Sequence, residues 1–280
     1  MEEKMSRKRL TERFPFLLPL RKWQRKLFFY TKMRFDGNIY AREQIKERLP
    51  FEVFRAVSPM INRNSGYDIK YQYNKAHNLK VAAGKLDRLI IKPGETFSFC
   101  LAVKNADRQT PYRDGLNLSG GKISGSYGGG LCQMSNVLYW LFLHSSLTVT
   151  ERHGHSVEAF PPASESEVKG VDATVSEGWF DLKVKNNTDS VYQITLSFGG
   201  ETMAACLRGE RPEEWEYEIY NPSVEYFRRK ERIMCRAEVN RRKRKGEGGW
   251  EEARMYQNIC EIGYKLPENI LSKIKGGKNE

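Results

Sequence analysis

The sequence predicts an α+β fold in which a helical N-terminal half packs on an antiparallel β-sheet. Apolar residues recur at helical spacing before position 143, whereas short alternating runs separated by tight turns follow it. Between the two halves, a glycine-rich loop leads directly into the apolar segment NVLYWLFL at 136–143, which predicts a central buried helix. Helices and strands segregated along the chain in this way are typical of the α+β class.

The chain is long enough for one main domain with a smaller segment at each end. Its 280 residues are 39% hydrophobic, which is sufficient for a sizeable core. We assign residues 1–38 to a basic, aromatic N-terminal segment, 39–209 to the α+β main domain and 210–280 to a charged, β-containing C-terminal appendage. Glycines at 246–249 predict a hairpin tip within this appendage.

The N-terminal segment is strongly basic. Between Lys4 and Arg34 it carries eleven Lys or Arg residues against one acid, interleaved with large apolar side chains, and the whole chain has a net charge of +12. This combination predicts peripheral binding to an anionic membrane surface. In the alternative interpretation, Trp23, Leu27 and Tyr30 dock on the protein's own core while the charges stay in water. Nucleic acid is not an expected partner, because no nucleic-acid-binding motif accompanies the charge.

The cysteines and the N-terminus indicate the cytoplasm. Five cysteines lie far apart without a CxxC pair, so we expect reduced thiols rather than a disulfide framework or a zinc ribbon. The apolar run at 14–20 is short and contains Pro15 and Pro19, which argues against a signal peptide or a spanning helix. We therefore expect a cytoplasmic protein, peripheral to the inner face of the membrane, and the sequence indicates no oligomeric state.

The first part of the main domain is predicted to be mainly helical. Apolar residues at 45, 49, 53, 54, 57 and 61 predict helices interrupted at Pro50 and Pro59. A further helix is predicted over 74–89, followed by a turn at 92–94 and a strand at 96–99. Residues 103–115 are predicted to form a surface loop that leads to the glycine-rich element.

The second part of the main domain is predicted to be mainly β-structure. Short strands are expected over 147–150 and 171–175, the second carrying Asp172. An antiparallel meander is predicted from 179–185, 191–198 and 202–207, because turn residues separate these runs.

Cys132 is predicted to lie in the first turn of the central helix. Unpaired N–H groups and the positive end of the helix dipole favour a thiolate there and lower its pKa. Gly128, Gly129 and Gly130 come just before it, and glycine permits left-handed backbone angles and the close approach of another group. A free cysteine can also be an inert, buried apolar residue, and this interpretation stays open.

A histidine cluster after the central helix completes a candidate catalytic set. A short turn after His144 would send the next strand back along the helix, so residues 151–155 are expected near Cys132. In the enzyme hypothesis Cys132 is the nucleophile, His155 or His153 the base, and Asp172 the group that orients the imidazole. Gln133 or backbone N–H groups at 130–132 would stabilise an oxyanion during acyl transfer or amide hydrolysis. The residues assigned to substrate binding are Gly128, Gly129, Gly130, Gln133 and Ser135.

Four motifs occur in order along the chain: KPGETFSF at 92–99, YGGGLCQMSNVLY at 127–139, ERHGHS at 151–156, and VDATV at 171–175 with FDLKVKNNTD at 180–189. Over residues 81–207 these motifs resemble the VanW family, and an ordered set is more specific than any single motif. The resemblance implies an association with glycopeptide resistance and cell-envelope metabolism. It also suggests a cell-wall peptide or precursor as the substrate, but it brings no established set of catalytic residues.

Two other interpretations stay open. In a non-catalytic binding or accessory protein, the glycine-rich loop and the histidine segment would hold a cell-wall fragment or a protein partner. In a metal site, His153, His155 and Cys132 would bind zinc with Asp172 as the fourth ligand. The metal hypothesis assumes that His-x-His lies on a strand, where both rings point to one face. We rank zinc below the thiol, so no metal or other cofactor is expected.

Overall fold

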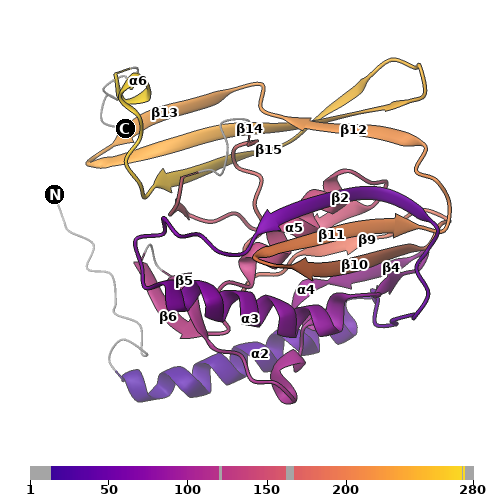
Figure 1. Cartoon of the computed structure of the whole chain (residues 1–280), viewed down its shortest axis with the longest axis horizontal. Helices are drawn as coiled ribbons and strands as arrows, with labels where there is room; N and C mark the ends of the chain where they lie inside the picture. Colours follow the sequence, from indigo (N-terminus) through magenta and orange to yellow (C-terminus); the bar gives the residue numbers. More distant parts are fainter. Residues whose placement is uncertain (1–13, 120–121, 162–166, 273, 275–280) are drawn as a thin grey trace.

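The computed structural model describes residues 14–119, 122–161, 167–272 and 274, and it confirms the predicted α+β class. The helices and the shorter strands form the lower body of the molecule in Figure 1, and a sheet of long C-terminal strands lies above them. The helices are α2 (Leu18–Phe35), α3 (Ile69–Leu86), α4 (Phe99–Ala102), α5 (Cys132–Leu143) and α6 (Glu268–Leu271). None of the helices in the described ranges has both the length and the apolarity that a bilayer span requires.

The lower body contains two four-stranded sheets and a separate hairpin. The first sheet has the antiparallel order β2 (Phe51–Pro59), β11 (Thr202–Gly209), β10 (Tyr192–Gly199) and β3 (Ile90–Ile91). The second has the order β1 (Ile39–Tyr40), β4 (Glu95–Ser98), β9 (Lys183–Lys185) and β7 (Thr148–Glu151), with β1 and β4 parallel. The hairpin consists of β5 (Asp114–Ser119) and β6 (Lys122–Tyr127).

The C-terminal sheet consists of the strands β12 (Trp215–Tyr220), β14 (Arg232–Lys245), β15 (Glu251–Ile262) and β8 (Val157–Glu158), with β13 (Val224–Arg229) also paired to β14. The hairpin tip predicted from the glycines at 246–249 is confirmed, because it joins the antiparallel strands β14 and β15. A hydrogen bond of 2.9 Å between the hydroxyls of Tyr139 and Tyr256 connects this sheet to α5.

The predicted central buried helix is confirmed as α5. Its residues Met134, Leu138, Leu141 and Phe142 have no exposed surface. They pack against β2 and β11, the two strands at one side of the first sheet. Since a single buried leucine contributes about 1.5–3 kcal/mol relative to an exposed one, this face is a major source of stability and holds α5 rigidly.

The helix predicted over 74–89 is confirmed as α3, although it begins and ends earlier. It begins at Ile69 because the carboxylate of Asp68 accepts a 2.9 Å hydrogen bond from the N–H of Lys70 and so caps the first turn. It ends at Leu86, since the next residue is already extended. α3 contacts β10 and β5 and therefore supports the hairpin that leads to Cys132.

The helices predicted between positions 45 and 61 are wrong, because residues 51–59 form β2. This strand pairs with β11 along its whole length. Apolar residues four positions apart fit both periods, since an even spacing also keeps residues on one face of a strand. The N-terminal half thus contributes β1 to β6 in addition to the helices α2 to α5.

Two predictions in the second part of the main domain also need correction. β10 and β11 form the predicted hairpin, but β9 pairs with β4 and β7 in the other sheet, so the three runs are not one meander. Residues 171–175 are not a strand. The Ala173 carbonyl accepts a 2.6 Å hydrogen bond from the Ser135 hydroxyl, and its N–H donates to Asn136 Oδ1 at 2.8 Å. Side chains of α5 therefore take the backbone groups that a neighbouring strand would use.

Candidate active site

Three glycines place Cys132 at the start of α5. Gly129 lies directly against Gly115 of β5, and a Cβ atom on Gly129 would collide with the Gly115 backbone. Gly128 and Gly130 have φ angles of +72° and +95°, which side chains disfavour. The glycine-rich stretch therefore forms the β5–β6 hairpin followed by a tight turn, rather than a continuous loop as predicted. The turn leaves Cys132 as the first residue of the helix.

His155 lies between Cys132 and Asp172. Its Nδ1–H donates a hydrogen bond of 2.5 Å to Asp172 Oδ2, and the same oxygen accepts the backbone N–H of His155 at 2.7 Å. With Nδ1 held in this way, Nε2 is the ring nitrogen left for the thiol, and the imidazole is one cause of the lowered pKa of Cys132. The hydrogen-bond partners of Cys132 Sγ are Thr174 Oγ1 at 3.5 Å and the Val175 carbonyl at 3.7 Å. The order nucleophile, imidazole and carboxylate matches the logic of thiol and serine triads.

The electrostatics of this group favour a charged pair. Burial raises the pKa of the Cys132 thiol, but the hydrogen bond with His155 and the charge of its ring outweigh burial and lower that pKa below its ordinary value of 9.0. Burial alone would lower the pKa of His155, yet hydrogen bonds with Asp172 and Cys132 raise it to about 10. Both shifts favour thiolate and imidazolium together, and the two groups titrate as a pair.

We expect the His155 imidazole to stay protonated far above its ordinary pKa of 6.5, with a midpoint of about 10. An NMR titration of the ring nitrogens measures this midpoint, and Cys132→Ser should lower it because the thiolate is one cause of the rise. The stability gained from the charged ring is fully present below pH 6.5 and is lost as the pH rises through about 10. A midpoint near 6.5 in the unmodified protein would contradict the charged pair.

Arg152 holds the carboxylate of Asp172 and was not predicted from the sequence. Its Nη2 donates to Asp172 Oδ1 at 2.7 Å and to the Gly170 carbonyl at 2.8 Å. The guanidinium also lies 4.2 Å from the ring centroid of Tyr256, a cation–π contact. Asp172 thus turns one oxygen to His155 and the other to Arg152. The sequence feature that could have pointed to Arg152 is its position inside the motif ERHGHS.

His153 does not lie between the thiol and Asp172. Its Nε2 lies 3.0 Å from Glu151 Oε1, and its ring packs on Phe180 with 4.6 Å between centroids. Glu151 in turn pairs with Lys183 at 2.9 Å. Of the two predicted histidines, the structure therefore brings only His155 together with Cys132 and Asp172.

Gln133 and Ser135 are used for packing in this conformation. The Gln133 side-chain amide donates to Ser58 Oγ at 2.8 Å and to the Pro59 carbonyl at 2.7 Å, which ties α5 to β2. Ser135 donates to the Ala173 carbonyl and so holds residues 172–175 against the thiol. In that position Thr174 Oγ1 lies 3.5 Å from Cys132 Sγ. Both side chains thus help to position the site, and their assignment to substrate binding stays a prediction.

The set proposed for zinc is not assembled. Within the described ranges, no group of three or more His, Cys, Asp or Glu residues is arranged to hold a metal ion. The zinc hypothesis placed both histidines on a strand, but β7 ends at Glu151 and residues 152–155 pair with no strand. The rings of His153 and His155 are therefore free to point to different partners.

Comparison with known proteins places this site in a family. The family description "VanW like protein" matches residues 74–208, a range that includes Cys132, His155 and Asp172. The Vancomycin B-type resistance protein VanW of Enterococcus faecalis (strain ATCC 700802 / V583) is 47% identical over 268 residues, covering 95% of this chain and 98% of that protein. The chain belongs to the VanW family.

A second similar protein is more distant. The uncharacterized protein YoaR of Bacillus subtilis (strain 168) is 31% identical over 136 residues, which cover 48% of this chain and 43% of that protein. No solved structure matches the chain. The VanW resemblance read from the four motifs is therefore confirmed by sequence.

Proposed function

We propose that this VanW family protein is a thiol-dependent acyl transferase or amide hydrolase that acts on a cell-wall peptide and contributes to vancomycin resistance. The observation that carries the thiol chemistry is the hydrogen bond of the His155 ring to Asp172, together with the lowering of the Cys132 pKa by that ring. The 47% sequence identity to a protein named for vancomycin resistance supports the proposed role in resistance. Together they suggest an amide bond of a cell-wall precursor as the substrate.

In the first chemical step the Cys132 thiolate attacks the carbonyl carbon of the amide. The C–N bond then breaks, and the imidazolium of His155 transfers its Nε2 proton to the departing amine. The products of this step are a thioester on Cys132 and a free amine. Asp172 keeps its hydrogen bond to Nδ1 throughout, so the ring stays oriented for the transfer.

The second step releases the acyl group. Neutral His155 accepts a proton from water or from an acceptor amine, which attacks the thioester and expels the Cys132 thiolate. Water gives hydrolysis, and an amine gives acyl transfer. The thiolate and imidazolium pair is thereby regenerated, in line with the raised pKa of His155.

The backbone N–H of Cys132 is the donor available for the oxyanion. Among the described residues this N–H has no hydrogen-bond partner, as expected for the first turn of a helix. Because the Gln133 amide donates to two residues of β2 instead, the predicted role of Gln133 as oxyanion donor is not part of this proposal. A donor fixed by the helix costs no reorganisation when charge develops.

An electrophilic cell-wall peptide analogue should trap Cys132. We expect one covalent adduct per chain by mass spectrometry, mapped to Cys132, and thioester formation or cleavage with the corresponding peptide amide. Cys132→Ser should abolish the adduct. Cys206→Ser serves as the matched control, since Cys206 is buried in β11 and its thiol lies near the Leu207 carbonyl.

The alternative function predicts a different result. If the peptide binds equally well to the unmodified protein and to Cys132→Ser, and no adduct or cleavage is found, the protein is a non-catalytic binding or accessory protein. An adduct on another cysteine would argue against the assignment of Cys132 as nucleophile.

A further inference from the structure

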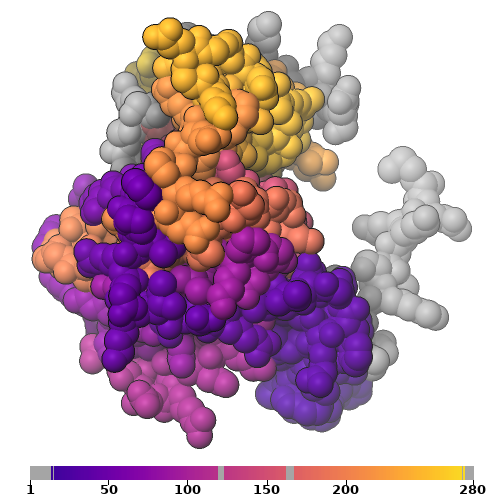
Figure 2. Space-filling model, turned by 90° about the vertical axis from the view of Figure 1, so that its right-hand side faces the viewer, coloured from indigo at the N-terminus to yellow at the C-terminus, as the bar shows by residue number. Residues whose placement is uncertain are grey.

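One face of α2 docks on the rest of the protein. The Tyr30 hydroxyl donates to Glu177 at 2.7 Å, and Lys26 forms an ion pair with the same carboxylate. Met33 is buried on this face. These contacts fix the orientation of α2, which forms the lower edge of the molecule in Figure 1 and a lobe at the lower right in Figure 2.

A second face of α2 and η1 (Pro15–Leu17) carries an apolar stripe that nothing in the described chain covers. Phe16, Leu20, Trp23 and Leu27 recur at intervals of four, three and four, so they lie on one side of the helix. Their exposed fractions are 75%, 61%, 61% and 53%. The expectation that Trp23 and Leu27 dock on the core is therefore wrong, and only Tyr30 of that set does so.

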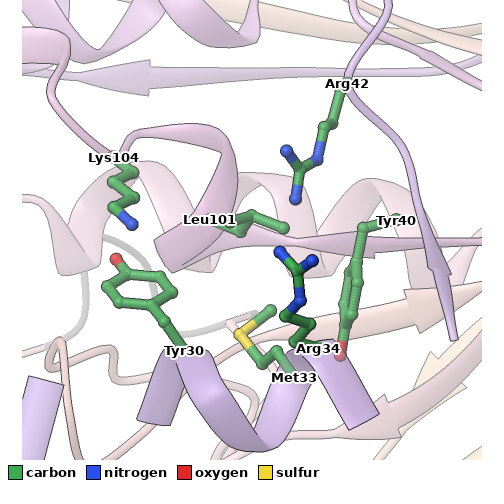
Figure 3. A pocket seen from close by; sticks show the side chains of 7 residues that line it. All are labelled: Tyr30, Met33, Arg34, Tyr40, Arg42, Leu101 and Lys104. Atoms are coloured by element: carbon green, nitrogen blue, oxygen red, sulfur yellow. The ribbon is translucent and has the colours of Figure 1, made fainter. Parts of the chain in front are cut away.

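The stripe leads to a cavity lined by three cations. Arg34 lies seven residues after Leu27, hence on the same side of the helix, and lines a cavity of about 240 Å³ with Arg42 and Lys104. Figure 3 shows the guanidinium groups of Arg34 and Arg42 pointing toward one another across it. The remaining lining residues are Tyr30, Met33, Tyr40 and Leu101.

No anionic side chain among the described residues neutralises these cations. In the part of the chain that the structure describes, neither Arg34, Arg42 nor Lys104 pairs with a carboxylate, and Lys104 instead lies 3.8 Å from the Tyr30 ring centroid. Two arginine guanidinium groups that face each other repel unless an anion lies between them. A phosphate group accepts hydrogen bonds from both guanidinium groups and is the anion that this geometry suits.

We propose that α2 and this cavity form a membrane-docking face, in which the apolar stripe enters the lipid interface and the cavity holds the phosphate of an anionic phospholipid. The stripe supplies the apolar surface of an interfacial helix, and the cations supply the attraction to anionic headgroups. The proposal does not depend on the chemistry of Cys132.

Sedimentation with lipid vesicles tests the docking face on the full chain. We expect binding to vesicles of phosphatidylcholine with phosphatidylglycerol at low salt, weaker binding at high salt, and none to phosphatidylcholine alone. The double variant Arg34→Gln and Arg42→Gln should weaken binding about 30-fold, at about fivefold for each cation near the surface. Both arginines are exposed and form no ion pair with a described residue, so the variant should keep its thermal midpoint.

A matched variant separates the docking face from overall charge. Arg228→Gln with Arg229→Gln removes the same two charges from exposed positions on β13, at the opposite side of the molecule from α2 (Figure 1). It should change vesicle binding less than twofold. An equal loss in both double variants would overturn the cavity as the binding site.

A second variant tests the apolar stripe, and a soluble anion tests the source of the phosphate. Leu20→Gln with Leu27→Gln should weaken vesicle binding at least tenfold, because both exposed side chains would enter the interface. Unchanged binding would overturn that insertion.

Titration with inorganic phosphate should show far weaker binding than to phosphatidylglycerol vesicles. Tight phosphate binding without vesicle binding would mean that the cavity takes a soluble anion, and would overturn the membrane assignment.

Discussion

Replacing His155 with Gln is expected to slow alkylation of Cys132 markedly at pH 7. In the native site the hydrogen bond with His155 is the main factor that lowers the pKa of the thiol, and burial opposes it. Without the imidazolium, burial should place the pKa above the ordinary value of 9.0, so less than about 1% of the thiol is ionised at pH 7. Since the thiolate is the reactive form, the rate falls with that fraction.

Iodoacetamide labelling followed over pH measures this effect. The unmodified protein should show an inflection below pH 9.0 and His155→Gln one above it, because a lower pKa keeps the thiolate present at lower pH. His153→Gln is the matched control, since that ring interacts with Glu151. Cys132→Ser corrects for the other four cysteines, all of which are buried. Identical profiles for the two histidine variants would remove the basis for His155 as the catalytic base.

Replacing Gly129 with Ala is expected to destabilise the protein by about 3 kcal/mol. The added Cβ would collide with the backbone of Gly115, which cannot move aside because β5 is paired along its length with β6. The Gly129 carbonyl is also fixed, since it accepts a 2.9 Å hydrogen bond from the Asn78 side-chain amide. The turn that presents Cys132 would therefore have to shift.

Thermal unfolding measures the loss of stability, and a fall in the midpoint of about 5–10 °C is expected. Gly84→Ala provides the control within the same chain. Gly84 lies in α3, and no heavy atom lies within 4 Å of the position that a Cβ would take there, so alanine should stabilise the helix by up to about 1 kcal/mol. Equal midpoints for the two variants would show that the contact between Gly129 and Gly115 is not tight.

Local sequence signals were sufficient for elements whose pattern has one interpretation. The apolar period after Cys132 predicted α5, and the start of the helix at this residue is confirmed. α3 followed from its period in the same way. Spacing by four positions, as at 53 and 57, suits helix and strand alike. The pairing with β11 is what makes this segment the strand β2.

The choice between the two histidines needed the tertiary structure. Alternation along a strand would have turned His153 and His155 to one face, but the strand ends at Glu151. Each ring then takes the direction of its strongest partner, Glu151 for His153 and Asp172 for His155. Neither partner can be identified from spacing, because the two contacts depend on how α5 and residues 171–175 pack together.

By itself, the sequence determined the fold class, the helix that begins at Cys132 and the four motifs that identify the family. These depend on local periodicity, on the backbone freedom of glycine and on residue identity. The tertiary structure decided the strand pairing, the contact of His155 with Asp172 and the role of Arg152. It also decided that Trp23 and Leu27 face outward. Each of these depends on contacts between segments far apart in the chain, for which local periodicity carries no information.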